Sequence, residues 1–132
     1  MLIEQEVQRL FTELVQYDRT QIELGGEVVT ITTFDNGAKF LLSTPVFKGG
    51  SYIPQSVRHC LSKGLQIGDG SIRCFPKIEE EQFTVYLHYL GVTRGLNPDR
   101  FRELLEEFAW IADEWRYLLD EHGKRDLIHV PL

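Results

Sequence analysis

Residues 97–123 have the sequence NPDRFRELLEEFAWIADEWRYLLDEHG, which predicts a long amphipathic helix. Asn97 suits the N-cap, and Pro98 suits the first helical position, where its missing N–H costs nothing. We expect the helix to end near Gly123, because glycine is common just after helix ends. Apolar residues repeat at helical spacing and predict a wide stripe that packs on the rest of the chain. The stripe consists of Phe101, Leu104, Leu105, Phe108, Ile111, Ala112, Trp115, Leu118 and Leu119.

The opposite side of this helix is acidic and carries two large aromatic residues. Residues 97–122 contain eight acidic and three basic side chains, so they hold most of the chain's net charge of −6. Trp110 and Tyr117 share one line along the helix, almost opposite the apolar stripe. Two interpretations are open. Either neighbouring loops or the C-terminal residues partly cover the pair, or the pair contacts another subunit or a partner protein.

A helix and three strands are predicted before this segment. Residues 2–17 carry apolar side chains at the spacing of one helical stripe. Alternating and β-branched residues then predict a β-meander, in which Gly25-Gly26 and Asp35-Asn36-Gly37 supply the turns. Its three strands are expected at residues 21–24, 28–34 and 38–44.

The middle of the chain predicts a short helix and two further strands. Residues 45–53 are expected to form an irregular loop. Its apolar side chains either cover the core or contact a partner protein. A helix should run from Pro54 to Gly64. The remaining segments are a strand at 71–75, a charged loop at 76–82 and a strand at 83–90. The order helix, three strands, short helix, two strands, long helix predicts an α+β fold, in which helices pack on an antiparallel sheet.

Composition restricts the class of protein. A chain of 132 residues that is 42% hydrophobic fits a single α+β domain over residues 1–132. Its acidic balance argues against binding to nucleic acid, which requires clustered Lys and Arg. No signal peptide, lipidation signal or membrane-spanning run is expected, and two isolated cysteines, Cys60 and Cys74, fit a reducing cytoplasm. We expect these two thiols to be inert, although a disulfide or a metal pair is the alternative.

No catalytic, cofactor-binding or metal-binding motif is expected in this chain. The sequence lacks a phosphate-binding loop, a dinucleotide-binding glycine motif, a zinc-protease motif and a nucleophile elbow. His59, His88, His122 and His129 fall on four different predicted elements. Three consecutive glutamates at 79–81 fit a soluble hairpin tip better than a pair of fixed catalytic carboxylates.

The order of elements and two stretches of sequence resemble the class I type III secretion chaperones, a family with the secretion-chaperone-like fold. One stretch is residues 101–119, FRELLEEFAWIADEWRYLL, which is similar to the family's closing helix. The other is residues 30–42, TITTFDNGAKFLL, which resembles its strand–turn–strand. The resemblance implies a cytoplasmic homodimer without nucleotide or metal. Such a dimer serves type III secretion, and so virulence, by holding the N-terminal segment of a secreted effector in an extended state.

An extended client can add a strand to an open sheet edge while its apolar side chains enter surface grooves. Ten residues are candidates for contacts with a client or a second subunit: Leu2, Phe11, Val15, Ile31, Phe40, Leu42, Phe47, Tyr52, Trp110 and Tyr117. Some of them must belong to the core, and the sequence does not separate the two roles.

Two other functions compete with this one. The first is a free-standing regulator or adaptor of the same fold that binds a folded protein. The second is a small enzyme whose site is assembled from Tyr52, His59, His88 and glutamates. A deep pocket with a titratable cluster would favour the enzyme, and we expect no enzyme activity.

Overall fold

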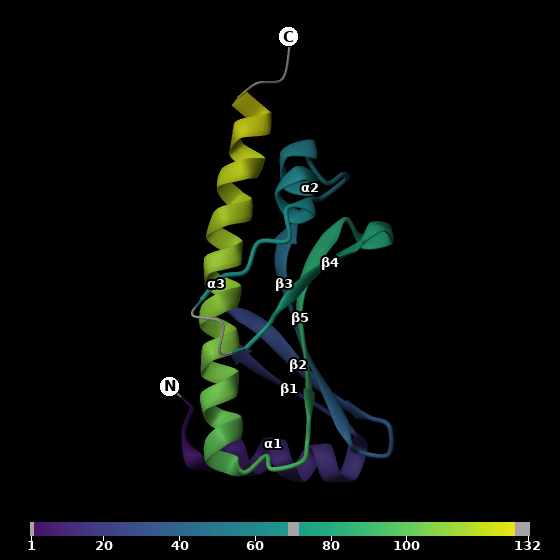
Figure 1. Cartoon of the computed structure of the whole chain (residues 1–132), viewed down its shortest axis with the longest axis vertical. Coiled ribbons are helices and arrows are strands. Elements are labelled where there is room, and N and C mark those ends of the chain that lie inside the picture. Colours follow the sequence, from purple (N-terminus) through teal and green to yellow (C-terminus); the bar gives the residue numbers. More distant parts are fainter. Residues whose placement is uncertain (1, 69–71, 129–132) are drawn as a thin grey trace.

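A computed structural model describes residues 2–68 and 72–128, with side chains as far as residue 124 (Figure 1). Within these ranges, helices and strands follow one another in the predicted order. The elements are α1 (Glu4–Tyr17), β1 (Arg19–Leu24), β2 (Glu27–Phe34), β3 (Lys39–Lys48), α2 (Gln55–Ser62), β4 (Phe75–Glu79), η1 (Glu80–Gln82, a 3-10 turn), β5 (Thr84–Val92) and α3 (Pro98–Ile128). The fold is therefore α+β, as the sequence predicts.

All five strands form one antiparallel sheet with the order β1-β2-β3-β5-β4. The first three strands are consecutive hairpins, whose turns use positive φ angles at Gly25 (65°) and Asn36 (55°). Strand β5 lies between β3 and β4 and pairs with β3 along its whole length. The two free edges of the sheet are therefore β1 and β4.

Helices α1 and α3 lie on one face of the sheet and close the core there. Figure 1 shows α3 running along the sheet, α1 crossing near the beginning of α3, and α2 near its far end. The predicted apolar stripe of α3 is confirmed: all of its members are buried except Leu118, which is partly buried. The N-cap is confirmed as well, because Asn97 Oδ1 accepts a hydrogen bond from the backbone N–H of Arg100 at 2.8 Å.

The side chain of Arg116 ties α3 to β3. Its Nε donates to the backbone O of Pro45 at 3.0 Å, and Nη2 donates to Thr44 Oγ1 at 3.0 Å. A third bond, from Nη1 to Asp113 Oδ1 at 2.6 Å, orients the guanidinium. These bonds fix the position of α3 along the sheet, because a guanidinium donates in a rigid planar geometry.

The predicted extents of β3 and β4 were wrong. Strand β3 continues through Pro45 to Lys48, where the sequence predicts a loop, because a bulge between Pro45 and Phe47 admits a residue without an N–H. Strand β4 occupies Phe75–Glu79, so it replaces both the predicted strand at 71–75 and most of the predicted loop. Residues 69–71 lie outside the described chain.

Helix α3 also passes through Gly123, which the sequence predicts as its end, and continues to Ile128. Gly123 is buried, and an added Cβ there would lie 3.3 Å from the Phe47 ring. The glycine is therefore explained by close packing inside the helix, rather than by a helix stop. None of the described helices combines the length and the apolar composition that crossing a bilayer requires.

Candidate functional site

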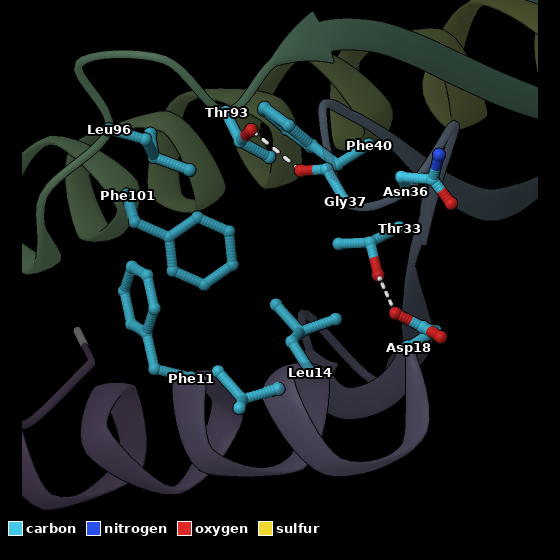
Figure 2. A pocket seen from close by; sticks show the side chains of 11 residues that line it. Phe11, Leu14, Asp18, Thr33, Asn36, Gly37, Phe40, Thr93, Leu96 and Phe101 are labelled. Atoms are coloured by element: carbon cyan, nitrogen blue, oxygen red, sulfur yellow. Dashed lines mark hydrogen bonds between the residues drawn. The ribbon is translucent and has the colours of Figure 1, made fainter.

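A pocket of about 360 Å³ opens at the end of the sheet, between α1, the β2–β3 turn and the start of α3 (Figure 2). The sequence explains its position. Helix α1 must turn back into β1 at Asp18, and β5 must leave the sheet before α3 begins at Pro98. Both connections leave the core face there, so the sheet end is only partly covered. The pocket is lined by Phe11, Leu14, Val15, Asp18, Thr33, Asn36, Gly37, Phe40, Thr93, Leu96 and Phe101.

Three phenylalanine rings make the apolar wall of this pocket. Phe11 and Phe101 meet edge to face, with centroids 4.9 Å apart and planes at 64°. Phe40 meets Phe101 at 6.5 Å and 79°. Phe40 and Phe101 are 2% and 0% exposed, so they belong to the folding core and support the wall from behind, whereas Phe11 is only partly buried. The apolar surface that an incoming side chain can contact therefore comes from Phe11, Val15 and Leu96, and the buried rings hold it in a preformed shape.

The polar margin of the pocket is held by hydrogen bonds between distant segments. Thr33 Oγ1 donates to Asp18 Oδ1 at 2.9 Å, and Thr93 Oγ1 donates to the backbone O of Gly37 at 2.7 Å (Figure 2). The backbone adds a bond from Thr93 N–H to Ala38 O at 3.0 Å. These bonds fix the β2–β3 turn against the segment that follows β5, so the mouth of the pocket is rigid on that side.

The pocket brings together three of the ten predicted contact residues. Phe11 is partly buried in the wall, Phe40 is buried at its base, and Val15 lies at the rim with 84% of its surface exposed. Tyr17, on the same last turn of α1, is also exposed. This end of α1 therefore presents apolar surface to solvent beside an apolar pocket.

Three other predicted residues lie in the core. Leu2, Ile31 and Leu42 are 3%, 0% and 0% exposed and pack among the buried residues. Their side chains are not accessible to a partner in this structure, because α1 and α3 cover that face of the sheet. We therefore assign them to folding and exclude them from the candidate site.

The last four predicted residues form two further groups. Phe47 and Tyr52 line a second pocket of about 300 Å³ near the far end of α3, together with Lys48, Gly49, Pro54, Asp120, Gly123 and Lys124. Trp110 and Tyr117 lie on the outer side of α3, where 53% and 70% of their surfaces are exposed. The predicted position of this pair on the acidic side of the helix is confirmed.

The outer face of the sheet is a further apolar surface, because α1 and α3 pack on the other face. Leu41 and Leu90 are direct cross-strand partners on it, and Phe75 is paired with His88. Five of its side chains are exposed large hydrophobics: Val28, Phe34, Phe75, Leu90 and Val92. These five side chains come from β2, β4 and β5, so the apolar surface is shared by three strands of the sheet.

Among the histidines that the structure describes, His88 is the one on this outer face. Its ring meets Phe75 edge to face at 5.5 Å and lies near Tyr86. Partial burial lowers the pKa of His88, and the nearby charge of Lys77 lowers it further, so the ring is neutral at pH 7. His88 therefore contributes an aromatic, uncharged surface.

The two cysteines are buried, free thiols, 3% exposed each. Burial raises the pKa of Cys60, and burial together with the Glu107 carboxylate raises the pKa of Cys74 to about 12. Both groups are therefore thiols at neutral pH and poor nucleophiles.

The residues considered for an enzyme site are separated. Tyr52 lines the second pocket, whereas His88 lines a polar hollow on the outer face with Ser43, Lys77, Glu79, Gln82 and Tyr86. His59 is exposed on α2 and lines neither, and His129 lies outside the described residues. Within the described chain, no three His, Cys, Asp or Glu side chains gather in a way that could hold a metal ion.

Sequence reasoning missed most of the pocket lining, including Leu14, Asp18, Thr33, Leu96 and Phe101. The Asp35-Asn36-Gly37 turn was predicted, but only as a turn. A signal was present at Asp18, which ends the apolar pattern of α1 directly before a strand. The missing information was the closeness of Thr93 and Leu96 to that turn, which depends on the long-range pairing of β3 with β5.

Comparison with known proteins places the fold. No family model matches the sequence, and no curated protein matches it. Among solved structures, the chain resembles the crystal structure of the ExsC–ExsE complex at 15% identity and a TM-score of 0.57, over 90% of this chain and 97% of that one. It also resembles the HopA1–SchA chaperone–effector complex at 13% identity and a TM-score of 0.57, over 76% of this chain and 77% of that one. With the strand order and helix positions described above, the chain has the secretion-chaperone-like fold.

Proposed function

We propose that this protein is a binding protein, without enzyme activity, that holds an extended segment of another protein in the pocket beside α1. The observation that carries the proposal is the open apolar pocket with Val15 exposed at its rim. We further propose that the segment is the N-terminal part of a secreted effector and that binding takes place in the cytoplasm. The type III secretion resemblance and the chaperone–effector complex among the structural neighbours support this assignment.

The free edge of β1 offers main-chain hydrogen bonds next to this pocket. Asp18 O accepts from Thr33 N–H at 2.9 Å, so Asp18 is a residue whose backbone faces β2. Because antiparallel pairing alternates along a strand, the backbone groups of Arg19, Gln21 and Glu23 face the free edge. Gln21 O already accepts from Arg9 Nη2 at a long 3.4 Å, so a client strand must displace that bond or pair beside it. The edge thus begins directly beside a pocket-lining residue. A client strand paired with β1 can place its end at the pocket mouth.

The pocket alone supports weak binding. Burying one large apolar side chain stabilises a complex by about 1.5–3 kcal/mol, which is less than the cost of immobilising a free segment. Edge pairing and further apolar contacts must therefore add to it. The exposed side chains of Val15 and Tyr17 are suitable for such contacts.

Val15→Asp is expected to weaken binding of an extended peptide at least about tenfold, because it places a charge at the rim of an apolar pocket. Stability should change by less than about 0.5 kcal/mol, since Val15 is 84% exposed. The measurement is fluorescence anisotropy with a labelled 15-residue peptide of alternating leucine and serine. A peptide with every leucine replaced by serine reports background binding.

Gln16→Asp is the matched control, because it adds the same charge at the neighbouring exposed position of α1, away from the pocket lining. It should retain wild-type affinity. Equal affinity of Val15→Asp and wild type, or equal binding of the serine peptide, would contradict the proposed site.

We also propose that two copies of the chain associate through the outer face of the sheet. The cross-strand pair Leu41 and Leu90 and the neutral aromatic group around His88 support this choice of surface. Lys77 and Glu79 beside His88 carry opposite charges, whereas residues 97–122 hold most of the net charge of −6, so two copies can approach through this face.

Light scattering at micromolar concentration is expected to give the mass of a dimer for the wild type and of a monomer for Leu90→Glu. Leu90 is 53% exposed, so the substitution should leave the subunit folded by circular dichroism. Trp110→Glu on α3 introduces the same charge at a surface residue of another face and should remain dimeric. If the wild-type protein is monomeric in this measurement, the proposed dimer is wrong.

The aromatic pair on α3 favours one alternative, an adaptor that binds a folded partner. Trp110 and Tyr117 project from the side of a helix, and a convex surface fits a folded protein better than an extended segment. If a purified partner of this protein loses affinity with Trp110→Ala but not with Val15→Asp, the adaptor is the better description.

A further inference from the structure

The pocket beside α1 carries one charged group, the carboxylate of Asp18, among otherwise apolar or uncharged lining residues. Three bonds hold this residue: its N–H donates to Leu14 O at 3.0 Å, its O accepts from Thr33 N–H, and Oδ1 accepts from Thr33 Oγ1, both at 2.9 Å. No Lys or Arg in the described part of the chain forms an ion pair with Asp18, and Lys39 on the adjacent turn pairs with Asp35. The pocket thus has at its margin a carboxylate that is held in place by hydrogen bonds and forms no ion pair within the described chain (Figure 2).

The end of α1 adds negative potential at the same place. Asp18 is the C-cap of α1 and adopts a left-handed conformation (φ 57°, ψ 12°), and the last turn of the helix has no basic residue. A helix C-terminus has partial negative charge from its unpaired carbonyl groups, and it favours a nearby cation. Among the described residues, no basic side chain lies in the last turn of α1 and none forms an ion pair with the Asp18 carboxylate.

We propose that the pocket selects segments in which an apolar side chain is followed two residues later by Lys or Arg. This inference rests on the proposed function and names the class of segment that the same site prefers. The apolar side chain enters the pocket against Phe11, Val15 and Leu96, in front of the buried Phe40 and Phe101 rings. Side chains two residues apart lie on one face of an extended segment, about 6.6 Å apart, so the cationic group reaches the pocket margin at Asp18.

The expected selectivity is modest because Asp18 lies at the surface. An exposed ion pair changes affinity by a few fold, up to about fivefold, and salt screens it. The general attraction of a basic peptide to an acidic protein must be separated from a specific contact at Asp18. The experiment therefore varies one peptide position and one protein position together.

The test uses four labelled peptides of one alternating leucine–serine sequence, which carry Lys, Arg, Gln or Glu two residues after the central leucine. Anisotropy titrations at low salt should give about fivefold tighter binding for Lys and Arg than for Gln, and weaker binding for Glu. Asp18→Asn should reduce the Lys preference to less than about twofold. Asparagine tolerates left-handed φ angles, and its amide oxygen can still accept from Thr33, so the variant should fold.

Glu4→Gln is the matched control, because it removes one carboxylate at the opposite end of α1. It should retain the full Lys preference, and 0.5 M salt should weaken that preference in both wild type and control. Equal binding of the Lys and Gln peptides to wild type would overturn the inference while leaving the proposed function intact. So would an unchanged Lys preference in Asp18→Asn. If no peptide binds, both the inference and the proposed function fail.

Discussion

Trp115→Ala is expected to lower the free energy of unfolding by about 3–5 kcal/mol, whereas Trp110→Ala should lower it by less than about 1 kcal/mol. The two residues lie on opposite sides of α3. Trp115 is 1% exposed and belongs to the core between α3 and the sheet, whereas Trp110 is 53% exposed. Removing Trp115 leaves a cavity that the surrounding side chains cannot fill, because the sheet and α3 are tied together by Arg116.

Urea unfolding followed by far-ultraviolet circular dichroism measures both values without depending on tryptophan fluorescence. Equal m-values among the three proteins would show that the change lies in stability. A loss of 3 kcal/mol or more in Trp110→Ala would show that its ring belongs to the core. A small loss in Trp115→Ala would contradict the placement of α3. Any partner that uses the outer side of α3 should lose affinity with Trp110→Ala more than the protein loses stability.

Gly49→Ala is expected to destabilise the protein by about 3 kcal/mol. A Cβ at this position would lie 2.1 Å from the backbone O of Tyr52 and 3.1 Å from the backbone O of Phe83. Backbone atoms cannot rotate away as a side chain can. The added methyl must therefore displace the 49–52 loop or break the hydrogen bond from Gly49 N–H to Phe83 O at 2.7 Å.

Gly50→Ala separates this steric effect from backbone conformation. Gly50 has φ of 78° and no atom within 4 Å of an added Cβ, so its substitution should cost about 1–2 kcal/mol for the left-handed conformation alone. Urea midpoints of the two variants give the comparison. If Gly49→Ala is at least as stable as Gly50→Ala, the 49–52 loop can move to accept the added methyl group. In that case the second pocket, which contains Phe47 and Tyr52, has no fixed shape.

The fold was predictable where one local pattern had one explanation. The apolar stripe and N-cap of α3, the first helix and the hairpin turns of the meander all follow from spacing and turn chemistry. Predictions failed where a residue type that usually ends a helix or strand is present for a different reason, which depends on tertiary packing. Pro45 indicated a strand end, but a bulge accommodates it, and Gly123 indicated a helix stop, but it makes room for Phe47. Such signals change their meaning once neighbouring segments pack against them.

The candidate site was predictable only in part, because periodicity assigns a side chain to a face and does not say how completely that face is covered. Ile31, Phe40 and Leu42 all face the helices, yet only Phe40 reaches the incompletely covered end of the sheet. The role of Asp18 depends on Thr33, which is fifteen positions away and reaches it through the β1–β2 pairing. The face of each strand was therefore predictable, and the position of the opening was not.

The place of β5 between β3 and β4 affects how a newly made chain matures. Once residues up to Lys48 have left the ribosome, all three strands of the meander are present. The edge of β3 that pairs with β5 stays unpaired until Thr84–Val92 have been synthesised. At roughly 5–20 residues per second, the intervening stretch takes several seconds to synthesise. During that interval the nascent polypeptide exposes an unsatisfied edge and a bare apolar layer, so it can pair wrongly with other chains. Slow or crowded translation should therefore favour aggregation of unfinished molecules rather than unfolding of finished ones.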